Sequence, residues 1–148
     1  MVKTISRRAL LALFLVGLFL IGARAADDAA FVARDGWLRQ PPASQTEAAI
    51  YVVIENHTAQ RRSIVSGSSD IAEKVELHEM KMNHTMMVMT PVPKVDIPAK
   101  GKATFDPSSL HIMLFGLKKR PMAGDTVTVN LTLDDGTMVL VTATVRKK

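Results

Sequence analysis

Short runs of β-branched and apolar residues alternate with polar residues from residue 31 to residue 146. A period of two is typical of strands with one buried face, and no segment after residue 25 repeats its apolar positions at helical spacing. The pattern predicts nine strands, at residues 31–39, 48–56, 61–66, 74–79, 86–91, 102–105, 111–117, 126–133 and 138–146. Nine short strands without helices indicate an all-β domain, either a sandwich or a barrel.

Turn residues separate these runs. Asp134-Asp135-Gly136 lies between two alternating runs, and Asp-Gly can take the positive φ angles of a type I′ turn. Residues 126–133 and 138–146 are therefore expected to form a hairpin. Prolines mark the other connections, because proline cannot donate a hydrogen bond inside a central strand. No repeat or linker divides residues 26–148, which indicates one domain.

The first 25 residues differ from the rest. Three basic residues precede an apolar run from Ala9 to Gly22, and the small-residue segment Ala23-Arg24-Ala25 follows. This order is typical of a secretory signal peptide, and the run is shorter than the roughly 20 residues that a membrane-spanning helix needs. We expect cleavage after Ala25 and export of residues 26–148, with an uncleaved membrane anchor as the alternative.

The exported part is almost neutral. The whole sequence has 19 basic and 14 acidic residues, and four of the basic ones lie in the first 25 residues, so the net charge falls from +5 to +1. A domain with this charge gives no reason to expect binding to nucleic acid or, after cleavage, to a membrane. Cysteine is absent, which excludes a lipid anchor on cysteine, a thiolate ligand and a redox-active thiol.

Histidine and methionine are concentrated between residues 78 and 89, which read HEMKMNHTMMVM, and His111 and Met113 follow as a second pair. Thioether sulfur is a soft, neutral ligand that suits Cu(I), and imidazole binds copper in either oxidation state. Zinc prefers thiolate, imidazole and carboxylate, and Ca²⁺ and Mg²⁺ prefer oxygen. The composition of this region therefore predicts a copper site.

Strand alternation separates possible ligands from core residues. Within residues 74–80, Val75 and Leu77 share one face, whereas His78 and Met80 share the other with charged side chains. His78 is therefore placed away from the core.

The same test applies to the strand around residue 111. Its apolar residues Leu110, Ile112 and Leu114 point toward the core, which leaves His111 and Met113 on the opposite face. Two ligands separated by one residue on one strand face can converge on a single ion.

Core packing is the competing explanation for the methionines, because Met commonly fills gaps in cores. In residues 86–90, even and odd positions point to opposite faces, and alternation alone does not decide which face is buried. Core packing is the favoured interpretation for Met86 or Met87, whereas Met80 and Met82 fit an exposed loop.

The spacing of four residues resembles the copper motif of the periplasmic copper chaperones called PCu(A)C. Ten residues separate His78 from Met89, twenty-one separate Met89 from His111, and one separates His111 from Met113. The resemblance extends over most of the exported chain, in the segments Gly36-Trp37-Leu38-Arg39, Pro41-Pro42, 51–56, 75–79, 111–117 and 124–127.

The resemblance implies a cupredoxin-like Greek-key β-sandwich that lacks the cupredoxin cysteine. Its implied ligands for Cu(I), near the surface, are His78, Met89, His111 and Met113. It further implies a periplasmic metallochaperone, not an enzyme, that supplies copper for the assembly of a respiratory oxidase. The implied partners are the copper-site subunit of the oxidase, a thioredoxin-like copper chaperone, or both.

Two features depart from the family pattern. Further potential ligands lie between the first two motif residues, and they are candidates for auxiliary ligands or for a second site: Met80, Met82, His84, Met86 and Met87. Ser108-Ser109 stands where family members often have Gly-Gly, which can alter the turn before His111 without removing a ligand. His57 belongs to no motif and is expected on the surface.

Two other functions could use the same residues. A copper-dependent redox enzyme would also have to hold Cu(II) well, which thioethers disfavour. A methionine-rich storage or buffering protein would bind several Cu(I) ions with similar affinity and would not transfer them. The sequence contains neither G-x-S-x-G nor a phosphate-binding glycine loop, so it does not support hydrolase or nucleotide-binding chemistry.

Overall fold

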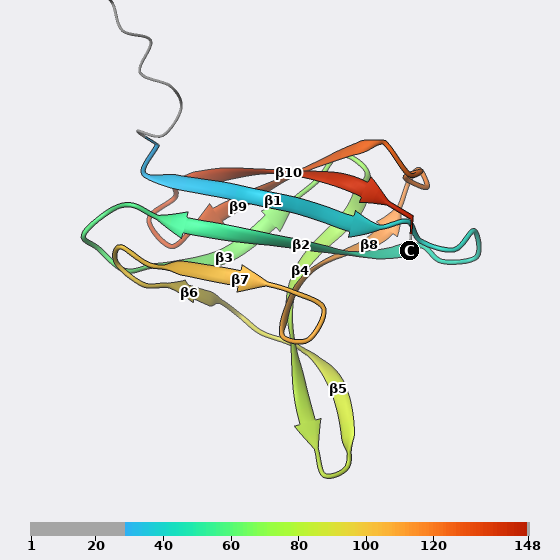
Figure 1. Cartoon of the computed structure of the whole chain (residues 1–148), viewed down its shortest axis with the longest axis horizontal. Coiled ribbons are helices and arrows are strands. Elements are labelled where there is room, and N and C mark those ends of the chain that lie inside the picture. Colours follow the sequence, from blue (N-terminus) through green and yellow to red (C-terminus); the bar gives the residue numbers. More distant parts are fainter. Residues whose placement is uncertain (1–28, 148) are drawn as a thin grey trace, which may run out of the picture.

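Strands make up the regular secondary structure of residues 29–147, the part of the chain that the computed structural model describes (Figure 1). They are, in chain order, β1 (Phe31–Arg39), β2 (Glu47–Asn56), β3 (Arg62–Ser68), β4 (Ala72–Asn83), β5 (Met86–Pro91), β6 (Val95–Ile97), β7 (Lys102–Phe105), β8 (Leu110–Leu117), β9 (Thr126–Leu133) and β10 (Met138–Arg146). The all-β prediction is confirmed. Among these residues no helix is long and apolar enough to cross a membrane. The predicted signal peptide lies outside the described residues.

The strand bounds follow the sequence pattern where alternation is strong. Both strands of the C-terminal hairpin, β9 and β10, begin and end at the predicted residues. The strand predicted at 74–79 extends to Asn83, so Met80 and Met82 lie in β4 and the loop expected for them is wrong. Strand β6 was not predicted, because its three residues lie in a short segment between Pro93 and Pro98.

The β9–β10 hairpin forms as predicted, but its turn is not of type I′. That turn needs positive φ at two central residues, and here Gly136 has a φ of 84° whereas Asp135 is not in the positive region. The Asp135 carboxylate instead accepts a hydrogen bond from the Thr137 N–H at 3.0 Å, and the Leu133 N–H donates to the Thr137 carbonyl at 2.8 Å. The loop from Asp134 to Gly136 has one residue more than the two of a type I′ turn, which leaves room for the contact of the Asp135 side chain.

The strands form one hydrogen-bonded order, β5-β4-β8-β7-β2-β1-β10-β9-β3-β6, with an additional pairing of β8 and β2. This open sheet folds over on itself. Gly67 of β3 lies against Val75 of β4, although several strands separate β3 from β4 in the hydrogen-bonded order. The two halves enclose a core whose largest fully buried side chains are Leu38, Ile50, Ile54, Ile64, Ile97, Ile112, Leu114, Leu131, Leu133, Val129, Val141 and Val145.

The end of β4 and all of β5 project from the body as a two-stranded hairpin (Figure 1). Strand β4 pairs with β8 only as far as Glu79, and beyond that point it pairs with β5 alone. A two-residue turn closes the hairpin, and His84 in this turn has a φ of 55°. At the base, the Met80 N–H donates a hydrogen bond to the Ser109 carbonyl at 2.8 Å. The base of the hairpin is therefore hydrogen-bonded to the body, whereas its tip projects away from the body.

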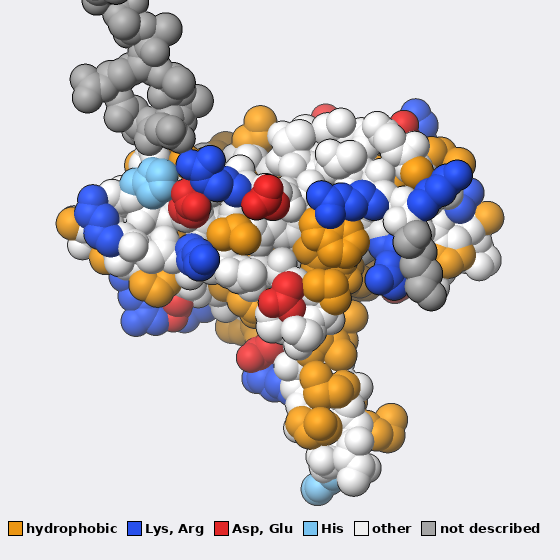
Figure 2. Space-filling view, viewed as in Figure 1, with side chains coloured by type: hydrophobic (Ala, Val, Ile, Leu, Met, Phe, Trp, Pro, Cys, Tyr) orange, Lys and Arg blue, Asp and Glu red, His pale blue; other side chains and the backbone are white. Residues whose placement is uncertain are grey.

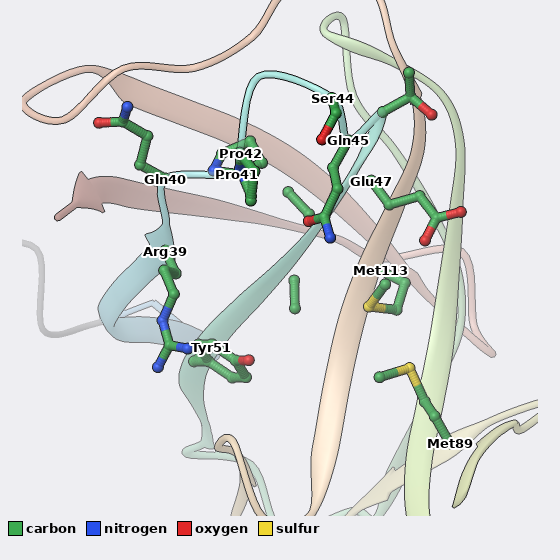
Figure 3. A pocket seen from close by; sticks show the side chains of 13 residues that line it. Arg39, Gln40, Pro41, Pro42, Ser44, Gln45, Glu47, Tyr51, Met89 and Met113 are labelled. Atoms are coloured by element: carbon green, nitrogen blue, oxygen red, sulfur yellow. The ribbon is translucent and has the colours of Figure 1, made fainter. Parts of the chain in front are cut away.

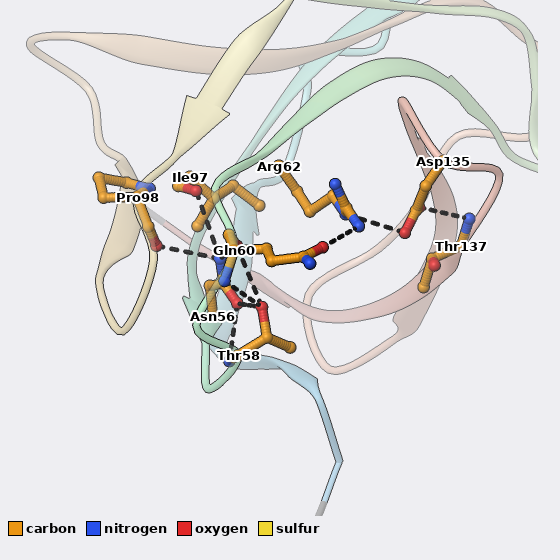
Figure 4. A network of polar contacts seen from close by, with 8 residues as sticks. All are labelled: Asn56, Thr58, Gln60, Arg62, Ile97, Pro98, Asp135 and Thr137. Atoms are coloured by element: carbon orange, nitrogen blue, oxygen red, sulfur yellow. Dashed lines mark hydrogen bonds and ion pairs between the residues drawn. The ribbon is translucent and has the colours of Figure 1, made fainter.

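A polar network around Asn56 joins β2, β3 and the connection after β6 (Figure 4). The Asn56 side chain is 1% exposed, and its Nδ2 donates to the carbonyl oxygens of Gln60 at 2.8 Å and Pro98 at 3.0 Å. Its Oδ1 accepts hydrogen bonds from the backbone N–H of Thr58 at 2.9 Å and from the Thr58 hydroxyl at 2.7 Å. One side chain thus satisfies backbone groups from two loops.

Replacing Asn56 by alanine should lower the free energy of unfolding by roughly 1–3 kcal/mol, because several buried polar groups lose their partner together. Denaturant unfolding measures this change. The exposed Asn83 of the hairpin is the matched control, and Asn83→Ala should stay within about 0.5 kcal/mol. Equal stability of the parent and Asn56→Ala would contradict the role given to this network.

Candidate metal centre

Three neighbouring strands bring the motif residues to one face of the sheet. In the β4–β8 ladder His78 lies directly opposite His111, and Glu76 lies opposite Met113. In the β4–β5 ladder Met80 lies opposite Met89. Directly paired residues point to the same side of a sheet, and so do residues two apart on a strand. His78, Met80, Met89, His111 and Met113 therefore share the face opposite the core residues Leu77 and Ile112.

This face is covered, which alternation alone did not predict. His111 is 2% exposed, Met113 7% and His78 8%, so these three side chains are almost fully covered. Met89 is 45% exposed. The site therefore has three enclosed residues and one that is open to solvent.

Aromatic side chains provide much of the cover. The Tyr51 ring meets the His111 ring edge-on with 5.5 Å between centroids, and Trp37 packs against Tyr51 at 4.6 Å. Beside the other histidine, the centroid of the Phe115 ring lies 5.6 Å from that of the His78 ring. Burial raises the pKa of the Tyr51 hydroxyl, so the phenol beside His111 is neutral at physiological pH.

The His78 ring is oriented by a carboxylate two residues earlier on the same strand face. Its Nε2 lies 2.8 Å from Oε2 of Glu76, whose Oε1 accepts from Lys74 Nζ at 2.6 Å. Hydrogen bonds from Lys74 and then His78 lower the pKa of Glu76, so the acceptor is a carboxylate. An ionised carboxylate can only accept, so Nε2 carries a proton, and in the neutral form of the ring Nδ1 keeps its lone pair.

The His111 ring has the same tautomer for a different reason. Its Nε2 lies 3.3 Å from the Pro107 carbonyl oxygen, which can only accept a hydrogen bond. Among the described residues, Nδ1 of His111 and Nδ1 of His78 are buried side-chain atoms without a hydrogen-bond partner. Buried polar atoms are rarely left unpaired, so two such nitrogen lone pairs on facing residues fit a bound cation.

The turn that holds the Pro107 carbonyl is built by Asp106. Its carboxylate accepts from the backbone N–H of Ser108 at 2.7 Å, from the Ser108 hydroxyl at 2.6 Å and from the Ser109 hydroxyl at 3.0 Å. These bonds, those of Ser108 foremost, lower the pKa of Asp106. Ser108-Ser109 therefore stabilises the turn through hydroxyl donors that Gly-Gly lacks.

A pocket of about 420 Å³ opens beside the two thioethers (Figure 3). Met89 and Met113 lie on one side of it, with Tyr51 and Arg39 on another. The β1–β2 connection, including Pro41-Pro42, and the start of β2 form the rest of the wall. The pocket gives a route from solvent to the thioethers.

The nitrogen and sulfur donors of the four motif residues are neutral, and the two thioethers are soft. Two imidazole nitrogens and two thioether sulfurs suit Cu(I), and they give a divalent ion no compensating charge. Within residues 29–147 no group of three or more His, Asp or Glu side chains could hold a metal ion without help from methionine. A metal site on this face would therefore need thioether ligands, and Met89 and Met113 are the candidates.

The structure also locates the residues that the sequence left open. Met89 and Met87 lie on the face of His78, whereas Met86 lies on the other face of the hairpin. Met86 is 67% exposed and Met87 49%, so the core packing favoured for either is wrong. His57 is partly exposed and pairs with Glu55 at 3.0 Å, away from the motif.

Sequence reasoning assigned no role to Glu76, Pro107, Tyr51 or Phe115. Glu76 and Phe115 have a simple sequence signal, because Glu76 lies two residues before His78 and Phe115 two residues after Met113, each on the same strand face. Tyr51 comes from another strand and Pro107 from a turn, so their contacts depend on the fold.

The family follows from a match over most of the chain. A family model for LpqE-like lipoproteins matches residues 31–145. The chain belongs to the LpqE-like (PCuAC) family. A comparison of this PCuAC chain with curated proteins gives no match.

Solved structures of PCuAC domains have the same fold. The copper-bound PCuAC domain from PmoF2 has a TM-score of 0.69 and 18% identity, over 81% of this chain and 95% of that one. For the apo PCuAC domain from PmoF1 the values are 0.68 and 20%, over 81% and 96%. The predicted cupredoxin-like fold is confirmed.

A third structure is more similar in sequence. The solution structure of Cu(I)-DR1885 from Deinococcus radiodurans is 32% identical, with a TM-score of 0.61, over 79% of this chain and 78% of that one. Together with the family match, it supports copper binding and a chaperone class for this PCuAC chain. The lipoprotein description of the family points to an exported protein.

Proposed function

We propose that the chain is a metallochaperone that binds one Cu(I) ion with His78, Met89, His111 and Met113 and transfers it to another protein. The observation that carries the proposal is the pair of buried Nδ1 atoms without a hydrogen-bond partner, on one face with two thioethers. An unpaired buried lone pair lowers stability, and one soft cation would satisfy both nitrogens. No catalytic group is required.

The unequal burial of the four ligands supports a transfer role. Three are enclosed, and the 45% exposed Met89 is the ligand that an approaching acceptor can replace first. Thioethers need no deprotonation to bind or to be released, so exchange at Met89 is independent of proton transfer. The same neutral ligands disfavour Cu(II), which argues against a copper-dependent redox enzyme.

We assign the carrier to the periplasm, after cleavage behind Ala25. Its recipients in this proposal are the copper-site subunit of a respiratory oxidase, a thioredoxin-like copper chaperone, or both. The basic and apolar N-terminal segment and the family match support export. Intact mass of the secreted protein checks the cleavage site, and a product that keeps residues 1–25 in the membrane fraction would contradict the assignment.

Copper transfer is the decisive test of the proposed function. The exported protein, loaded anaerobically with one equivalent of Cu(I), should lose the metal to an apo copper-site fragment of an oxidase subunit, as measured by copper content after the two proteins are separated. Tight binding without transfer to any offered acceptor would favour storage. Turnover of a reductant with dioxygen would instead favour an enzyme.

A further inference from the structure

The projecting hairpin exposes methionine side chains that no core requires. Met82 is 64% exposed and Met87 49%, and Figure 2 shows hydrophobic side chains along the hairpin surface. Large apolar side chains that are exposed together favour aggregation, and in soluble proteins such patches commonly mark binding sites. Their position therefore calls for a binding role.

Strand pairing arranges these methionines in a ladder. Met80 lies opposite Met89, and Met82 lies opposite Met87, so all four side chains share one face of the hairpin. Directly opposite Cβ atoms are about 4.5–5.5 Å apart, and residues two apart on a strand are about 7 Å apart. The three rotatable bonds of a methionine side chain let sulfurs at these spacings turn toward one ion.

The ladder face carries no charge. The hairpin's charged residues Glu79 and Lys81 lie on the opposite face, where their side chains pair at 3.1 Å. A neutral set of thioethers gives a divalent cation nothing to offset the loss of its hydration, whereas Cu(I) is soft and has a single charge. The chemistry of this face therefore selects a soft monovalent ion.

We propose that Met80, Met82 and Met87 form a second Cu(I) site on the hairpin, separate from the four-ligand site. The inference goes beyond the proposed function, because it concerns thioethers that the four-ligand site does not use. The second ion is held more weakly, since Met82 and Met87 are exposed, Met80 is only half-buried and no imidazole takes part. Met89, which faces Met80, lies between the two sites and links them along one face.

Metal stoichiometry tests the second site. Anaerobic titration of the exported protein with Cu(I), in competition with a chromophoric Cu(I) chelator, should give two bound ions, the second at least about tenfold weaker. The double variant Met82→Leu/Met87→Leu should bind one ion with the affinity of the tighter parent site. Both positions are exposed and leucine has a similar size, so the fold should be kept.

Met86→Leu is the matched control, because Met86 lies on the same hairpin, is 67% exposed and faces the other way. This variant should still bind two ions. As a second measurement, the methyl NMR signals of Met82 and Met87 should shift only with the second equivalent of Cu(I), and that of Met86 should not shift.

The outcomes separate this inference from the proposed function. A parent that binds a single ion, or a Met82→Leu/Met87→Leu variant that still binds two, would overturn the second site and leave the four-ligand site standing. Loss of the second ion in Met86→Leu would overturn the assignment to the ladder face. In His111→Ala the weak ion should remain, and its disappearance together with the tight ion would show that no separate site exists.

Discussion

Replacing His111 by alanine should weaken Cu(I) binding by at least about 100-fold, which corresponds to about 2.7 kcal/mol. In the proposed site the ring supplies one of two imidazole ligands, and it is held by the Pro107 carbonyl and by Tyr51 in a region that is closed to solvent. His111 is the residue that pairs with His78 in the β4–β8 ladder, so its loss leaves this position without an imidazole. Competition with a Cu(I) chelator measures the change.

The control for His111→Ala is the same substitution at a histidine outside the motif. His57 is partly exposed and pairs with Glu55, so His57→Ala should leave Cu(I) affinity unchanged. Circular dichroism should show that both variants keep the fold. A folded His111→Ala protein with the affinity of the parent would remove His111 from the ligand set.

Neighbouring residues on β8 should separate stability from metal binding. Ile112 is fully buried in the core, so Ile112→Ala should lower the free energy of unfolding by roughly 2–5 kcal/mol while Cu(I) affinity stays near that of the parent. Met113 lies on the opposite face with His111, and Met113→Leu should weaken Cu(I) binding at least about tenfold, or about 1.4 kcal/mol. Its packing cost should remain below about 1.5 kcal/mol, because leucine is of similar size.

Denaturant unfolding and chelator competition, each applied to both variants, check this pair. The methionines of the hairpin could supply a replacement ligand, so Met113→Leu should also be measured with Met80 and Met82 changed to leucine. Parent-like affinity in that background would exclude Met113 as a ligand. Parent-like stability of Ile112→Ala would contradict the placement of Ile112 in the core.

The sequence predicts most strands because their faces differ clearly in polarity. In β9 and β10 every second residue is buried, and both strands have the predicted bounds. The end of β4 lacks this contrast, since residues 80–83 are methionine, lysine and asparagine and none of them is buried. Pairing with β5 extends this strand, and the sequence of β4 alone does not contain that information.

In the candidate site, too, the sequence predicts some features, whereas others depend on contacts between strands. Alternation predicts that His111 and Met113 share a face, but it says nothing about what covers that face. Tyr51 of β2 provides cover only because β2 pairs with β8, which is a contact between distant parts of the sequence. For β5, alternation does not decide whether the even or the odd positions share the face of His78. The pairing of Met80 with Met89 shows that the odd positions do.

The hairpin that ends β4 gives the proposed site one movable ligand. Beyond Glu79 it is a two-stranded ribbon, and such ribbons are marginally stable without further strands. His78, His111 and Met113 lie where β4, β8 and β2 pair side by side, so they keep their positions when the ribbon bends. Bending at the base, which requires the hydrogen bond from the Met80 N–H to the Ser109 carbonyl to open, would carry Met89 away from the other three ligands and leave Cu(I) three-coordinate. The rate of copper release would then follow the rate at which the ribbon opens. An acceptor that binds the open ribbon could accelerate release without entering the enclosed part of the site.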